Sequence, residues 1–83
     1  MFTADWCAAC RQAKRWLQQR AVRFEERNIQ AQPSAAADLR RLNASGSIPT
    51  FLVDGAVISG FNPGVLEAAI RKAEQARALP QRR

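Results

Sequence analysis

Apolar residues near the start of the chain recur at the spacing of a helix that runs over about residues 7–19. They are Ala9, Ala13, Trp16 and Leu17. Arginine and glutamine fill the opposite side, and no glycine or proline interrupts the pattern. The strand before this helix is reduced to Phe2-Thr3, whereas strands usually run about 5–6 residues. This stub suggests that residues are missing upstream of Met1.

The pattern next predicts a strand over residues 22–29 and a helix over about residues 34–43. In the strand, Val22 and Phe24 alternate with charged neighbours. The apolar side of the helix consists of Ala35, Ala36, Leu39 and Leu42. The dipeptide Pro33-Ser34 offers two starting points for this helix, so the sequence leaves that boundary open.

A β-hairpin follows, because the apolar runs 50–53 and 57–59 flank Asp54-Gly55, which is one of the stronger short turn signals. The segment Gly60-Phe61-Asn62-Pro63 ends the hairpin and opens a last helix. The apolar stripe of that helix consists of Val65, Leu66, Ala69, Ile70 and Ala73.

The resulting order, β-α-β-α-β-β-α, predicts an α/β fold with two parallel strands joined by a crossover helix, then an antiparallel hairpin and a helix. Such a chain forms a mixed four-stranded sheet with helices on both faces. With 83 residues there is room for one domain, which we place at residues 1–78. We expect residues 79–83 to form a frayed C-terminal tail.

The composition is that of a globular protein, with 47% hydrophobic and 24% charged residues. No apolar run approaches the roughly 20 residues of a membrane helix, and we recognise no signal peptide. We therefore expect a cytoplasmic protein without membrane contact. The net charge of +6 can favour nucleic acid, but aromatic residues do not interleave with the basic ones as in single-strand binders. A solvated helix face is the preferred interpretation, and we expect no nucleic-acid partner.

The chain has two cysteines, Cys7 and Cys10, and no histidine. Two cysteines cannot form the disulfide framework of small secreted domains, nor close a zinc site of four Cys or His ligands, so we expect no metal. Without histidine, Cys-His and Ser-His-Asp catalytic sets are excluded. The remaining interpretation is a redox-active Cys-x-x-Cys pair, with inert thiols or half of a shared zinc site as alternatives.

The position of the pair, where the first strand gives way to the first helix, favours redox chemistry. A helix N-terminus stabilises a thiolate through its unpaired N–H groups and partial positive charge. Cys7 is therefore the expected nucleophile, and Cys10, one turn further on, the resolving thiol. Arg11 should also stabilise a thiolate, whereas Asp5 should oppose it, and the sequence leaves this competition open.

Three segments carry a family resemblance: Phe2 to Cys10, Ser47-Ile48-Pro49-Thr50 and Ser59-Gly60-Phe61-Asn62-Pro63. They are similar to the corresponding segments of glutaredoxins, which belong to the thioredoxin-fold superfamily, and the resemblance covers about residues 1–73. It implies a thiol–disulfide oxidoreductase, an electron carrier that reduces protein or mixed disulfides. It also implies that Pro49 is a cis-proline facing the cysteine pair, and that Ile48 offers its backbone to an extended substrate or to glutathione.

The resemblance assigns a complete binding site for substrate or glutathione: Ile48, Pro49, Gly60, Phe61 and Asn62. Gly60 would leave room for the ligand, and the helix start at Phe61-Asn62 would hold a glutathione carboxylate. The chain departs from glutaredoxins at Ala8-Ala9 in place of Pro-Tyr, at Ala4 in place of lysine, and at Asn62-Pro63 in place of an Asp pair. The segment Ser59-Gly60-Phe61 with its following proline instead resembles the redoxins that serve ribonucleotide reductase and draw electrons from thioredoxin reductase.

The resemblance therefore implies a disulfide-containing protein as substrate and either glutathione or thioredoxin reductase as electron donor. We expect a monomer without a bound cofactor, with glutathione at most a co-substrate. The alternative function is a glutathione-ligated iron–sulfur cluster carrier, in which Cys7 of each chain in a dimer would supply a thiolate.

Overall fold

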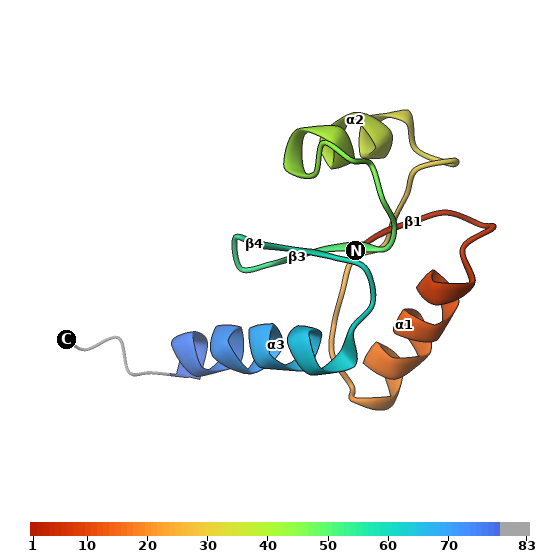
Figure 1. The fold of residues 1–83 in the computed structure, drawn as a ribbon. Coiled ribbons are helices and arrows are strands. Elements are labelled where there is room, and N and C mark those ends of the chain that lie inside the picture. Colours follow the sequence, from red (N-terminus) through yellow and green to blue (C-terminus); the bar gives the residue numbers. More distant parts are fainter. Residues whose placement is uncertain (79–83) are drawn as a thin grey trace.

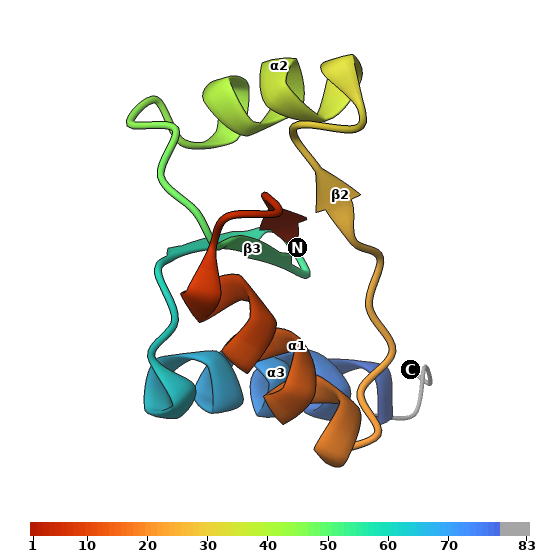
Figure 2. The same cartoon turned by 90° about the vertical axis from the view of Figure 1, so that its right-hand side faces the viewer.

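The computed structural model describes residues 1–78, in which a four-stranded sheet lies between two helical layers (Figure 1, Figure 2). The strands are β1 (Phe2–Thr3), β2 (Arg27–Asn28), β3 (Thr50–Val53) and β4 (Ala56–Ser59). The helices are α1 (Ala8–Gln19), α2 (Pro33–Leu42) and α3 (Pro63–Ala78). The tail predicted at residues 79–83 lies outside the described residues.

The sheet has the strand order β2-β1-β3-β4. The pair β1–β2 is parallel, and the pairs β1–β3 and β3–β4 are antiparallel. Figure 1 shows α2 on one face of the sheet and α1 and α3 on the other. The predicted α/β fold, a mixed sheet with helices on both faces, is therefore confirmed.

Each face of the sheet has its own apolar core. On the side of α1 and α3, the buried residues are Ala13, Leu17, Phe51 and Leu66. On the side of α2, they are Phe2, Ala35 and Leu39. The two central strands thus send one phenylalanine to each side, because successive strand residues point to opposite faces.

The predicted strand over residues 22–29 is wrong for most of its length, because only Arg27–Asn28 joins the sheet. The partner strand β1 has two residues, so it offers partners to two residues of the segment. Beyond Asn28 the chain turns, since the Asn28 side chain accepts hydrogen bonds from the N–H groups of Gln30 and Ala31 at 2.8 and 3.2 Å. The alternation of apolar and charged residues thus identified residues 22–29 as extended, but it did not identify a strand to which they hydrogen-bond.

The other boundaries lie close to the predicted ones. Helix α2 begins at Pro33, which occupies a position at the helix start where a missing N–H costs nothing. The hairpin turn at Asp54 and Gly55 has φ angles of 50° and 89°, as a two-residue hairpin loop of the type favoured by Asp-Gly requires.

Several basic residues of the net positive chain form ion pairs on the surface. Lys14 pairs with Glu26 at 3.1 Å and Arg20 with Glu67 at 2.7 Å. The Arg20 guanidinium also lies 4.4 Å from the ring centre of Trp16. Within residues 1–78, no helix is both long enough and apolar enough to cross a membrane.

Candidate redox site

The two cysteines lie together at the start of α1. Cys7 is the N-cap residue of this helix, and its Sγ accepts a hydrogen bond from the backbone N–H of Cys10 at 3.1 Å. The N–H of Cys7 donates to the carbonyl of Ala4 at 3.1 Å, which fixes the turn that leads from β1 into the helix. Both thiols are free. The sulfur of Cys7 thus already receives one of the N–H groups that stabilise a thiolate at a helix start.

Helix α1 holds the pair in place through its apolar stripe. Cys10, Ala13 and Leu17 are its buried residues, at the three- and four-residue spacing of one helix face. No acidic residue lies in the first turn, where a negative charge would oppose a thiolate. Cys7 and Cys10 have exposed fractions of only 5% and 1%. A substrate disulfide can therefore reach the pair only at the small exposed part of Cys7.

The environment of Cys10 keeps its thiol protonated. Burial, followed by the hydrogen bond with Cys7, raises the pKa of Cys10 to about 12, and the Glu26 carboxylate contributes in the same direction. Cys10 is therefore a poor nucleophile in the reduced protein at neutral pH. The order in which Cys7 attacks first and Cys10 resolves stays a prediction.

The raised pKa of Cys10 gives a prediction for alkaline stability. The folded state holds the proton more tightly than the unfolded state, so this contribution is complete below about pH 9 and is lost as the pH rises through about 12. We expect the urea midpoint of the reduced protein to fall between about pH 8 and about pH 11, and to fall less in Cys10→Ala. Equal falls in the two proteins would contradict this expectation.

Asp5 and Arg11, which the sequence predicts to have opposite effects on the Cys7 thiolate, are both held by hydrogen bonds. The Asp5 carboxylate accepts from the Asn28 side chain at 2.7 Å, and the Asp5 N–H donates to Gln30 at 2.6 Å. Arg11 donates to the Asp5 carbonyl oxygen at 3.1 Å. Asp5 is thereby fastened to the loop after β2, and the residue before Cys7, Trp6, stays 67% exposed beside the site.

The charged pair of Lys14 and Glu26 lies near enough to Cys10 for the Glu26 carboxylate to act on its thiol. The buried hydroxyl of Thr3 donates to Glu26 at 2.7 Å, and Lys14, one turn after Cys10, donates to both Glu26 oxygens at 3.3 and 3.1 Å. The Thr3 hydrogen bond, and then that of Lys14, holds the pKa of Glu26 below its usual value. Sequence reasoning missed this cluster, because its members come from β1, α1 and the segment before β2.

The loop before β3 lies at the same end of the sheet as the cysteine pair. The register pairs Phe2 with Thr50, and β1 and β3 are antiparallel, so Pro49 precedes β3 where β1 leads toward Cys7. The bond between Ile48 and Pro49 is cis, which confirms that part of the prediction. The Pro49 carbonyl accepts from the Gly60 N–H at 2.7 Å, which brings three of the predicted site residues together.

Phe61 and Asn62 have structural roles in the described chain. Phe61 packs against the core on the α1–α3 side and meets the Trp16 ring edge-on at 6.0 Å. The Asn62 side chain accepts from the N–H groups of Gly64 and Val65 at 3.1 and 3.3 Å, so it caps α3. These donors are among those that a bound carboxylate would use, and glutathione binding there stays a prediction.

Gly60 has a φ of +82°, and a Cβ built on it would meet no atom within 4 Å. The glycine is therefore required by the backbone angle and leaves open space on its surface.

A network of hydroxyl and amide groups, not predicted from the sequence, links the loop before β3 to the end of β4. The Asn43 side chain donates to Thr50 at 3.2 Å, and the hydroxyls of Ser47 and Ser59 lie 2.8 Å apart.

The site combines a buried dithiol at a helix start with a cis-proline at the same end of the sheet, and the profile of the glutaredoxin family matches residues 1–58 of the chain. The chain belongs to the glutaredoxin family. It is 24% identical, over 72 residues, to an uncharacterized glutaredoxin-like 8.6 kDa protein in the rubredoxin operon of Clostridium pasteurianum. That match covers 87% of this chain and 96% of the relative.

Solved structures agree with the glutaredoxin assignment. The crystal structure of the thioredoxin-like protein BC3987 superposes with a TM-score of 0.66 at 31% identity, over 82% of this chain and 93% of that one. Its T8A mutant gives a TM-score of 0.69 at 27% identity, over 83% and 93% of the two chains. The described fold is therefore thioredoxin-like.

A shorter similarity extends to transcriptional regulators. The global transcriptional regulator Spx of Enterococcus faecalis is 36% identical over 42 residues, and Spx 1 of Lactococcus lactis is 40% identical over 42 residues. These matches cover 51% of this glutaredoxin-family chain and about a third of each regulator, 32% and 33%.

Proposed function

We propose that this protein is a thiol–disulfide oxidoreductase that reduces disulfides of protein substrates through Cys7 and Cys10. The observation that carries the proposal is the position of Cys7, whose Sγ caps α1 and accepts the Cys10 N–H at 3.1 Å. Cys10 is buried and stays protonated at neutral pH, and it supplies the second thiol one helical turn after Cys7.

The reaction begins when the Cys7 thiolate attacks one sulfur of the substrate disulfide. The substrate S–S bond breaks, its second sulfur leaves as a thiolate and takes a proton, and Cys7 holds the first sulfur in a mixed disulfide. Cys10 then loses its proton and attacks the Cys7 Sγ, which releases the second substrate thiol. The substrate gains two electrons and two protons, and Cys7 and Cys10 are left as a disulfide for the electron donor to reduce.

The backbone beside Pro49 is the proposed docking edge for the substrate. Ile48 is half-buried and adjoins the cis bond, and an extended substrate segment can pair with its backbone N–H and C=O as a short added strand. The exposed ring of Trp6, the residue before Cys7, offers apolar contact to a substrate.

The function is tested by insulin reduction with dithiothreitol as the electron source. The protein should accelerate precipitation of the insulin B chain well above the dithiothreitol background. A rate equal to that background, from protein whose circular dichroism shows it folded, would overturn the proposal.

The proposed electron donor is a thioredoxin reductase rather than glutathione. Asn62 already occupies N–H groups at the α3 start, and Ala4 offers no charge for a glutathione carboxylate. We expect NADPH consumption with insulin to require thioredoxin reductase, and to stay at background with glutathione and glutathione reductase. The opposite pattern would assign glutathione as donor and leave the thiol chemistry intact.

A further inference from the structure

Helix α1 and its C-cap residue carry basic side chains and no acidic one. The basic residues are Arg11, Lys14, Arg15 and Arg20. Two of them, Lys14 and Arg20, form ion pairs with carboxylates of other elements. Within residues 1–78, Arg11 and Arg15 form no ion pair, and both are exposed. The uncompensated positive charge of the helix is therefore concentrated in these two side chains.

Arg11 and Arg15 lie in line with Cys7 along α1. The Arg11 N–H donates to the Cys7 carbonyl at 3.3 Å, so Arg11 lies one turn after the cysteine. Arg15 lies one turn further on, on the same side of the helix. The Arg11 guanidinium donates to the Asp5 carbonyl oxygen at 3.1 Å, which holds it back beside the turn that leads into Cys7. We call the surface formed by Cys7, Arg11 and Arg15 the α1 strip.

The acidic groups around the cysteines are directed to other partners. Asp5 is the only acidic residue among the first 20 of the sequence, and its carboxylate accepts from the Asn28 side chain at the end of β2. The Glu26 carboxylate is held by the Thr3 hydroxyl and by Lys14. The start of α1 adds the partial positive charge of a helix N-terminus. The α1 strip therefore favours negative charge in whatever lies along it.

The spacing of the α1 strip matches that of an extended polypeptide. A helix rises about 1.5 Å per residue, so Arg11 and Arg15 follow Cys7 at about 6 and about 12 Å along the axis. An extended segment advances about 3.3 Å per residue, and its second and fourth residues point to the same side as the residue from which they are counted. Carboxylates two and four residues from a substrate cysteine therefore reach the two guanidinium groups while the cysteine sulfur lies at Cys7.

We propose that this protein prefers substrate proteins that carry acidic side chains two and four residues from the attacked cysteine. Their carboxylates pair with Arg11 and Arg15 and place the substrate sulfur at Cys7. The inference rests on the proposed function, because it concerns the substrate of the same dithiol. The substrate disulfide is reduced to two thiols, and Cys7 and Cys10 are oxidised to a disulfide, as in that function.

The test compares three peptides, each supplied as a disulfide-linked dimer, in a single turnover with excess reduced protein. The first is acetyl-Glu-Ser-Glu-Ser-Cys-Ser-Glu-Ser-Glu-amide. The second has glutamine in place of each glutamate. The third exchanges the glutamate and serine positions, so that its charges lie one and three residues from the cysteine. Thiol release is followed by chromatography after acid quenching, and each rate is divided by the rate with dithiothreitol, which corrects for the intrinsic reactivity of the peptide.

We expect the first peptide to be reduced at least about fivefold faster than the other two at low ionic strength, because the paired charges raise the rate of productive encounter. Equal rates for the three peptides would overturn the inference and leave the proposed function intact. No reduction of any of them by folded protein would overturn the proposed function as well.

Ionic strength gives a second readout of the same contacts. Raising it from about 0.01 to about 1 M shortens the screening length from about 30 to about 3 Å. The advantage of the first peptide should then fall below about twofold, because both guanidinium groups are exposed. An advantage that does not change with salt would contradict a charge-based preference.

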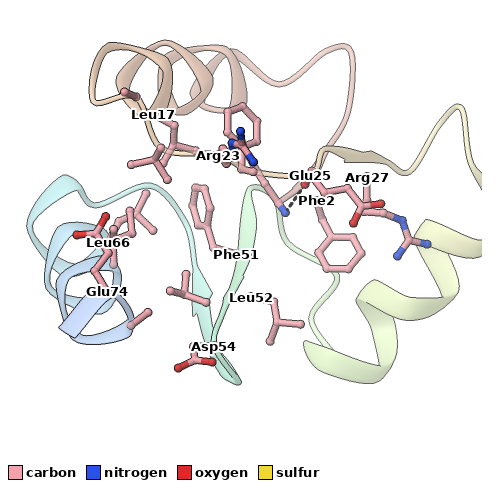
Figure 3. Close-up of a pocket in the computed structure, with 17 residues that line it drawn as sticks. Phe2, Leu17, Arg23, Glu25, Arg27, Phe51, Leu52, Asp54, Leu66 and Glu74 are labelled. Carbon is pink, nitrogen blue, oxygen red and sulfur yellow. Dashed lines mark hydrogen bonds between the residues drawn. The ribbon is translucent and has the colours of Figure 1, made fainter. Parts of the chain in front are cut away.

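Two double variants remove the same charge from different places. Arg11→Gln with Arg15→Gln changes the α1 strip, whereas Arg23→Gln with Lys72→Gln removes two exposed charges that form no ion pair within residues 1–78 and lie outside α1. Figure 3 shows Arg23 among the residues that line a cavity of about 450 Å³, to which neither cysteine contributes.

The quantity compared is the ratio of the rates for the first and second peptides within each variant, so that any change in Cys7 reactivity on loss of Arg11 cancels. We expect this ratio to fall at least about threefold in the α1-strip variant and to stay at the wild-type value in the other variant. Equal ratios in the two variants would overturn the assignment of the preference to Arg11 and Arg15.

Discussion

Replacing Cys7 by serine should reduce the rate of insulin reduction to the dithiothreitol background. A serine hydroxyl is not ionised at neutral pH and does not form a mixed disulfide, so the first step has no nucleophile. The variant should nevertheless fold, because serine is among the preferred N-cap residues and can accept the same Cys10 N–H. Loss of activity with an unchanged urea midpoint therefore separates chemistry from stability.

The companion variant Cys10→Ser should stop the reaction one step later. Cys7 still attacks the substrate, but no second thiol is present to attack the Cys7 sulfur. We expect a covalent complex with insulin chains on a non-reducing gel. Dithiothreitol should reduce this complex, and a mass spectrum should place the linking disulfide at Cys7. An adduct that also forms in Cys7→Ser, or full activity of either variant, would contradict the assigned roles.

The fold was largely predictable because its signals are local. Helical spacing identified α1, and Asp54-Gly55 identified the hairpin, since each signal lies within a few neighbouring residues. The strand predicted over residues 22–29 failed because membership of a sheet depends on a partner. With β1 reduced to Phe2–Thr3, the segment before Arg27 has no strand to pair with.

The same distinction applies to the site. The cysteine pair and the cis-proline could be predicted, because a motif or a family resemblance marks them. The fastening of Asp5 by Asn28 and the contact of Thr3 with Glu26 could not, because each joins residues 23 positions apart. Such contacts depend on the parallel register of β1 and β2, in which Thr3 lies beside Asn28. The electrostatics of Cys10 therefore required the folded structure.

The small core on the α2 face of the sheet packs against Ile48, a residue of the candidate site. Its buried core contains only Phe2, Ala35 and Leu39, and half-buried Ile48 packs against the same cluster. A side chain removed from this small core leaves a cavity that few neighbours can fill. Ile48 adjoins Pro49, so the packing of α2 also supports the proposed docking edge.

The variant Leu39→Ala should therefore lose about 2–5 kcal/mol of unfolding free energy, a large share of the roughly 5–15 kcal/mol typical of native proteins. Leu42→Ala makes the same chemical change on the same helix, where the side chain is 39% exposed against 2% for Leu39. We expect it to cost less than about 1 kcal/mol, because little apolar surface leaves the core. Urea denaturation with a common slope measures both values, and equal losses would mean that α2 is not held to the sheet through Leu39.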